Sequence, residues 1–443
     1  MKNDWPNQRT GKMPVSCFVG RPLMRSGVKA IEMWNAAEKG LRPENRPKVN
    51  SHIHLPPNFS AFENVNQAID LAAQQHVRVL GVSNYYDYAV YEDVAKLTRE
   101  NGIFPLFGLE IIALIDELVK SGVKINDPGN PGKIYICGKG ITRYSQMSSE
   151  AQRLIEIIRK NDSLRIREII RKLEGLFTQR GTPTGLDEAK IIDLVVRRHE
   201  CLRERVYLQE RHVCQAFQEA FWEKVPPGQR MEKLTKVLGV PPKTVHDPVK
   251  VQNDIRTHLM KAGKPAFVEE TFVTFEEAYR LILELGGMPC YPTLADGTKP
   301  LCPFEEPVEK LIERIKSMGV HMAEFIPIRN TPEVLSKYVK AMRSAGLAIV
   351  GGTEHNTLDL LPIEPTCLNG QPVPEDVKDI FWEGACVAAA HQFLTSQGEP
   401  GFVDNLGRTN PAFSSDEERI GPFARLGAAV IQRYYSQATD AHR

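Results

Sequence analysis

The sequence alternates short apolar runs with amphipathic runs, in two stretches separated by a long block that lacks strand signals. In the first stretch, predicted strands at 48–55, 77–82, 104–111 and 133–138 accompany helices at 63–75 and 91–101. In the second, predicted strands at 288–292, 322–328 and 347–351 accompany helices at 275–285, 308–318, 332–345 and 376–394. Such alternation is typical of parallel strands covered by helices. The sequence therefore predicts an α/β fold.

The block between these stretches is predicted to be helical. It contains long amphipathic runs at 151–177 and 186–222, rich in Arg, Glu, Lys, Leu and Ile. Its mixed-sign charge is the usual solvated face of paired helices, with a polyanion-binding surface as the alternative. The predicted division is an N-terminal extension (1–46, with a helix at 28–39), a barrel (47–145 and 284–397), a helical insertion (146–283) and a C-terminal tail (398–443, with a helix at 424–436). We expect the insertion to cover one end of the barrel or to form a homo-oligomer contact.

Charge and composition narrow the classes of partner. The formal net charge of +1 argues against a dedicated nucleic-acid binder, and no apolar run is long enough to span a bilayer. The start is polar and lacks the apolar core of a signal peptide. The eight cysteines form no CxxC pair, so we expect reduced thiols and no cysteine zinc site. These features predict a cytoplasmic protein that acts on a small molecule.

His52 and His54 flank one residue at the end of the first predicted strand. Alternate strand residues project to the same face, so the two imidazoles point into one small volume. Imidazole is the commonest protein ligand for divalent transition metals. The pair therefore indicates half of a metal site, with two unrelated histidines at a strand edge as the alternative.

Further candidate ligands lie at the ends of later strands, where parallel α/β barrels place their sites. Glu110 ends the third strand, and Glu354 and His355 follow the last one. Together with the two histidines they suit Zn²⁺, Mn²⁺ or Fe²⁺. Alternatively, Glu110 caps the following helix and His355 is a surface histidine. Four more strand-end residues are candidate substrate contacts: Tyr85 and Tyr291 as hydrogen-bond donors, and Arg143 or Arg329 as anion-binding groups.

The order of these motifs resembles the PHP (polymerase and histidinol phosphatase) superfamily. Its opening HxH is matched by His52 and His54, its GxE by Gly108 and Glu110, and its terminal motif is approximated by 352–355. The resemblance covers about 48–145 and 284–395. It implies a distorted seven-stranded β/α barrel, TIM-like and of PHP type, with a helical insertion. It also implies two or three metal ions and the cleavage of phosphoesters.

The chain departs from the PHP pattern at several ligand positions. The Thr-Asp-His motif of the family is 83–85 here, Ser-Asn-Tyr, and the Ala-His-Pro context is 290–292, Cys-Tyr-Pro. Glu354 replaces an aspartate, and His355 follows it directly. We therefore expect one divalent ion, held by His52, His54, Glu110, Glu354 and His355. The leading hypothesis is a metal-dependent hydrolase of a small anionic substrate, such as a phosphoester. A one-metal sugar-acid isomerase or amidohydrolase-like enzyme and a catalytically inactive binding module are the alternatives.

Overall fold

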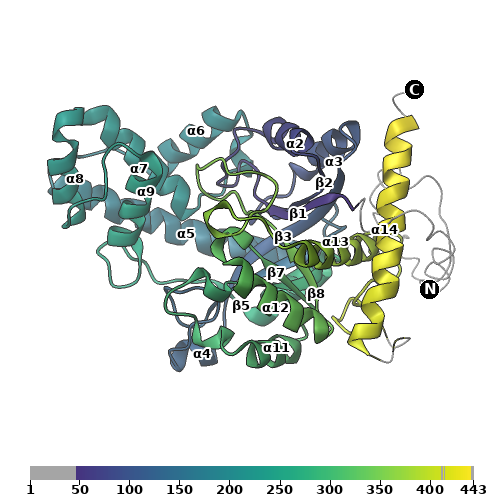
Figure 1. Ribbon diagram of the computed structural model, residues 1–443. Helices are drawn as coiled ribbons and strands as arrows, with labels where there is room; N and C mark the ends of the chain where they lie inside the picture. Colours follow the sequence, from purple (N-terminus) through teal and green to yellow (C-terminus); the bar gives the residue numbers. More distant parts are fainter. Residues whose placement is uncertain (1–45, 411–412, 414, 441–443) are drawn as a thin grey trace, which may run out of the picture.

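The computed structural model describes residues 46–410, 413 and 415–440. Most of the predicted N-terminal extension, with its helix at 28–39, lies outside the described residues. Figure 1 shows a sheet wrapped by helices on one side of the molecule and a group of helices projecting from it on the other.

Seven strands form a nearly closed, barrel-like sheet in the order β1-β2-β3-β4-β6-β7-β8. They are β1 (Lys48–Ile53), β2 (Val77–Val82), β3 (Phe104–Leu114), β4 (Lys133–Lys139), β6 (Met288–Thr293), β7 (Met322–Phe325) and β8 (Ala348–Gly351), and the short β5 (Val273–Thr274) pairs with β3. The last strand returns to the first through a parallel bridge between Ile53 and Glu354. The barrel-like sheet agrees with the predicted fold class.

The direction of one strand differs from the parallel arrangement expected from the sequence. β1 to β3 are mutually parallel, as are β6 to β8, but β4 is antiparallel to both β3 and β6. A parallel return needs a long crossover, usually a helix. The segment between β3 and β4 contains only the five-residue α4 (Asp116–Lys120), so the chain reverses beside β3.

Helices cover the outside of the sheet, and three of them begin at residues whose side chains cap the helix. The Asn64 side chain caps α2, and Thr274 and Glu277 form a reciprocal capping box at α10. The covering helices are α2 (Val65–Gln74), α3 (Tyr91–Glu100), α10 (Phe275–Glu284), α11 (Val308–Ser317), α12 (Pro332–Ser344) and α13 (Glu375–Ser396). In the last part of the chain, α14 (Asp416–Asp440) packs across α13 (Figure 1).

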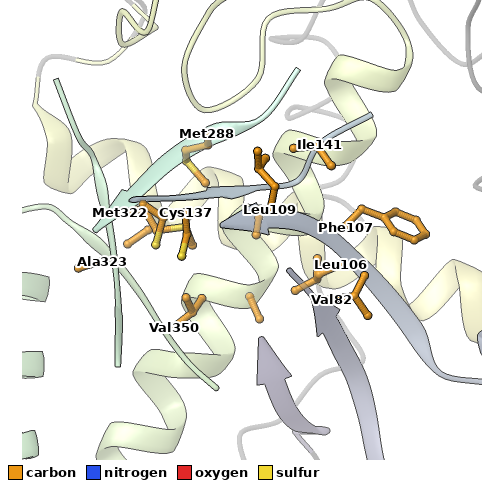
Figure 2. Close-up of a cluster of buried hydrophobic side chains, with 14 of the residues drawn as sticks. Val82, Leu106, Phe107, Leu109, Cys137, Ile141, Met288, Met322, Ala323 and Val350 are labelled. Atoms are coloured by element: carbon orange, nitrogen blue, oxygen red, sulfur yellow. The ribbon is translucent and has the colours of Figure 1, made fainter. Parts of the chain in front are cut away.

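Apolar side chains from most strands of the sheet are buried in one large hydrophobic core. Figure 2 shows side chains from β2, β3, β4, β6, β7 and β8 meeting in this core, including Leu109, Cys137, Met322 and Val350. Each of these four is almost fully buried. Burying a large apolar side chain contributes about 1.5–3 kcal/mol to folding, so this core fixes the positions of the strand ends.

The helical block has a second hydrophobic core. It consists of α5 (Ser149–Gln179), α6 (Glu188–His199), α7 (Glu210–Lys224), α8 (Arg230–Leu238) and α9 (Pro248–Ile255), with a π-turn at Arg256–Met260. Buried residues from Ile166 to Ala266 form a cluster separate from that of the barrel. The long α5 joins the two, because its first turns contribute Leu154 and Ile155 to the barrel core. Among the described residues, no helix is long and apolar enough to cross a membrane.

Candidate metal centre

Three of the predicted ligands meet at the end of β1, with Glu110 inside the longer β3 rather than at its end. His52 Nε2 lies 3.3 Å from His54 Nε2 and 3.5 Å from Glu110 Oε2, and His54 Nε2 lies 3.1 Å from the same carboxylate oxygen. All three side chains are at most 5% exposed. Alternation along β1 places both imidazoles on one face, as expected from the sequence.

This triangle of donor atoms fits a divalent cation. Ligand atoms about 2.0–2.1 Å from a tetrahedral zinc ion lie about 3.3–3.4 Å from one another, close to the three separations here. Glu110 Oε2 and His54 Nδ1 are also buried polar atoms without a hydrogen-bond partner among the described residues. Buried polar atoms normally have a partner, so an oxygen left without one indicates a missing ligand.

Glu324 orients the His52 imidazole by binding the ring nitrogen that lies away from the triangle. Its Oε2 accepts a hydrogen bond of 2.7 Å from His52 Nδ1, which fixes the imidazole so that Nε2 points to the other two donors. Its Oε1 accepts from Lys139 Nζ and from the Ser51 hydroxyl, each at 2.7 Å. A carboxylate on the far nitrogen of a ligating histidine is the usual support in metal sites. Glu324 was not among the predicted site residues, although a glutamate inside an otherwise apolar strand is a signal for such a role.

The charges of this cluster are strongly coupled. Burial acts to lower the pKa of His52, but the carboxylates of Glu324 and Glu110 reverse this effect and raise the pKa to about 9. Burial acts to raise the pKa of Glu324, but Lys139 and His52 lower it to about 2. The pKa of Glu110 is likewise held below its ordinary value by the two histidines, against the effect of burial. The metal-free cluster is therefore ionic, with a proton on His52 where a cation would sit.

Glu354 and His355 lie on the turn that follows β8, outside the triangle. Both have left-handed backbone conformations, with φ of 60° and 52°. Non-glycine residues rarely adopt this conformation, and such strained residues cluster at functional sites. The turn is held to β1 by hydrogen bonds of 2.8 Å from Glu354 N to His52 O and from His54 N to Glu354 O.

The side chains of this turn point to different partners. Arg329 and Asn356 both donate to Oε2 of Glu354. His355 is held 2.7 Å from the Thr353 hydroxyl by Nδ1 and 2.9 Å from the Leu361 carbonyl by Nε2. Both ring nitrogens of His355 are therefore engaged away from the triangle, whereas Glu354 keeps one carboxylate oxygen without a hydrogen bond from the described residues.

The four residues predicted to contact the substrate do not all lie at one site. The Tyr85 ring stacks on His54 with centroids 5.1 Å apart, and burial raises the pKa of its phenol. Tyr291 donates instead to the buried Glu305, at 3.0 Å, and Arg143 donates to the Glu284 carbonyl. Tyr85 and Arg329 line the large cavity described next, and Tyr291 and Arg143 do not.

A cavity of about 590 Å³ lies between the strand ends of the barrel and the helical block. The barrel contributes Tyr85, Glu110, Arg329 and Glu354 to its lining. The helical block contributes Asp162, Arg165, Glu210, Arg211, Arg256 and Lys261. His52 and His54 are buried behind this lining, so Glu110 is where the triangle meets the cavity. The volume suits a small-molecule ligand.

Comparisons with known proteins add distant structural likenesses. No protein-family model matches the sequence, and no curated protein matches it. An amidohydrolase from Chromobacterium violaceum, solved with sulfate and no metal, has a TM-score of 0.47 and 16% identity over 75% of this chain and 96% of that chain. A candidate metal-dependent phosphoesterase from Bifidobacterium adolescentis has a TM-score of 0.49 and 13% identity over 76% and 95% of the two chains. Likenesses at this level carry no functional argument, so the assignment rests on the side chains of this chain.

Proposed function

We propose that this protein is a one-metal hydrolase of a small anionic substrate, with a phosphoester as the leading class and a PHP-type barrel as its scaffold. The observation that carries the proposal is the buried triangle of His52, His54 and Glu110, which opens at Glu110 into a cavity of small-molecule size. These three residues would hold Zn²⁺, Mn²⁺ or Fe²⁺. A divalent ion bound there would polarise a substrate oxygen and acidify a bound water.

The remaining residues position the reaction. Glu324 holds His52 in the orientation that directs Nε2 into the triangle. Arg329 and Asn356 fix the Glu354 carboxylate through Oε2, which leaves Oε1 as a proton acceptor on the cavity wall. A positioned carboxylate is a suitable general base for a water molecule. In this proposal Glu354 takes up the proton, and the phenol of Tyr85 donates a hydrogen bond to the substrate.

The test is turnover by protein freed of metal and then supplied with Zn²⁺, Mn²⁺ or Fe²⁺, over a panel of phosphomonoesters, phosphodiesters, lactones and uronates. We expect hydrolysis of a phosphoester that depends on the added ion. His54→Ala should abolish both turnover and metal retention, whereas His246→Ala, which changes an exposed histidine of the helical block, should leave both unchanged.

A second variant separates the proton acceptor from the ligands. Glu354→Gln should lower kcat by the 10²- to 10⁴-fold typical of general-base removal while the metal content stays at the wild-type value. Metal-dependent isomerisation of uronates without hydrolysis would replace the hydrolase by an isomerase. Turnover that persists in fully metal-free protein would overturn the proposal.

A further inference from the structure

We infer that Arg211 and Lys261 of the helical block, together with Arg256, form a binding site for an oxyanion group of the ligand, a phosphate or a carboxylate. The inference deepens the proposed function, because it assigns the recognition of the anionic group to the helical block rather than to the barrel. All three side chains line the cavity into which Glu110 also opens.

Most of the cationic side chains that line the cavity pair with carboxylates. Of the six cationic side chains in the lining, four have carboxylate partners: Lys133 with Asp127 and Glu270, Arg165 with Glu210, Arg256 with Glu210, and Arg329 with Glu354. Among the described residues, the Arg211 guanidinium and the Lys261 ammonium have no ion-pair or hydrogen-bond partner. Buried or half-buried charges are normally paired, so these two cations are available to a ligand.

The local backbone brings Arg211, Arg256 and Lys261 close together. The chain leaves α9 through a π-turn at Arg256–Met260, directly before Lys261. Arg256 begins this turn and Lys261 follows its last residue, and the two charges are close enough to interact. Arg211 lies in the first turn of α7, next to Glu210, which binds Arg256 at 2.8 Å.

The cationic side chains in this wall of the cavity repel one another. Burial and the neighbouring charge of Arg256 lower the pKa of Arg211. Burial and the same guanidinium lower the pKa of Lys261, with Lys133 adding to the effect. The carboxylates that face these cations are Glu210, Asp127 and Glu354, and each of them already binds another cation. A bound oxyanion would remove the repulsion and supply the missing hydrogen-bond acceptor.

The test uses the full chain, freed of metal by a chelator, with inorganic phosphate as one probe and malonate as the other. We expect a saturable rise in the thermal midpoint of wild-type protein with at least one of the two. Removing a charged partner of an anion typically weakens such contacts by about 1.5–3 kcal/mol, which is about 10- to 150-fold in Kd. Arg211→Gln and Lys261→Gln should show this loss.

Matched controls are available in the same block. Lys264→Gln changes an exposed lysine three residues beyond Lys261, and Arg197→Gln changes an exposed arginine of α6. Both variants should bind the probes as the wild type does. The probe that binds more tightly identifies the oxyanion as a phosphate or a carboxylate.

Equal binding by wild type, Arg211→Gln and Lys261→Gln would overturn the inference, as would a failure of both probes to bind. Because the titration is carried out without metal, its result does not depend on the triangle. Protein that binds phosphate but no metal would contradict only the proposed hydrolase. Protein that binds metal but neither probe would contradict only this oxyanion site.

Discussion

The barrel and the helical block both enclose hydrophobic cores, but they contribute different functional groups to the cavity between them. The barrel brings buried imidazoles and the carboxylates Glu110 and Glu354, which are the groups that bind a cation and take up a proton. The helical block brings Arg211, Arg256 and Lys261, which are groups that bind an anion. In our proposals, the barrel holds the metal ion and the inserted helices bind the anionic group of the ligand.

The largest expected effect tests whether the two regions fold as separate cores. Phe217 is fully buried in the helical block. Phe217→Ala should lower the free energy of unfolding of the block by about 3–5 kcal/mol through the cavity that it leaves. Hydrogen exchange should then show faster exchange in α6, α7 and α9, with the barrel strands and the metal content unchanged. Uniformly faster exchange in both regions would mean that they unfold as one unit.

The next effect tests the barrel side of the comparison. Glu110→Gln removes the only carboxylate of the triangle and should lower metal affinity by more than the 10- to 100-fold that outer-shell changes typically cause. Isothermal titration of metal into chelator-treated protein measures this loss. Glu223→Gln, an exposed change on α7, serves as the control and should bind metal normally. An unchanged affinity in Glu110→Gln would remove this carboxylate from the site.

A smaller effect is expected from the residue behind the triangle. Glu324→Gln keeps an oxygen for His52 Nδ1 but removes the charge that Lys139 pairs with at 2.7 Å. Metal affinity should fall by about 10- to 100-fold, as for other outer-shell partners of ligating histidines. The thermal midpoint of the variant shows whether the titrated protein is folded. A folded variant with wild-type affinity would reduce Glu324 to a structural role.

The smallest expected effect is the dependence of metal affinity on pH. Because the pKa of His52 is raised to about 9 in the metal-free cluster, a cation must displace its proton. Metal affinity should therefore rise about tenfold per pH unit and level off near pH 9. In the metal-free protein, the same shift adds stability that is complete below the ordinary pKa of 6.5 and is lost as the pH rises to about 9. Affinity that is flat between pH 6 and 8 would contradict this charge assignment.

The sequence predicted the barrel-like alternation and the convergence of His52, His54 and Glu110, because strand periodicity and strand-end position are local signals. It did not predict that β4 runs antiparallel, since an apolar run carries no direction. The side chains of Glu354 and His355 contact different partners because both residues have left-handed backbone conformations. Their residue types do not predict these conformations.

The cations of the helical block were missed for a different reason. Arg211, Arg256 and Lys261 lie in helices of mixed charge, where such residues are usually solvated. Only the tertiary structure shows that they turn toward a cavity and that two of them have no carboxylate partner among the described residues. The role of Glu324 likewise depends on the near closure of the sheet, which brings His52 of β1 within hydrogen-bond distance of β7.

Crystals of the protein grown with Zn²⁺ and measured at the zinc absorption edge would show whether the two imidazoles and Glu110 bind one metal ion. We expect one anomalous peak within about 2.0–2.2 Å of His52 Nε2, His54 Nε2 and Glu110 Oε2. Saturating zinc that leaves no peak between these three atoms, or that binds only elsewhere on the molecule, would contradict it.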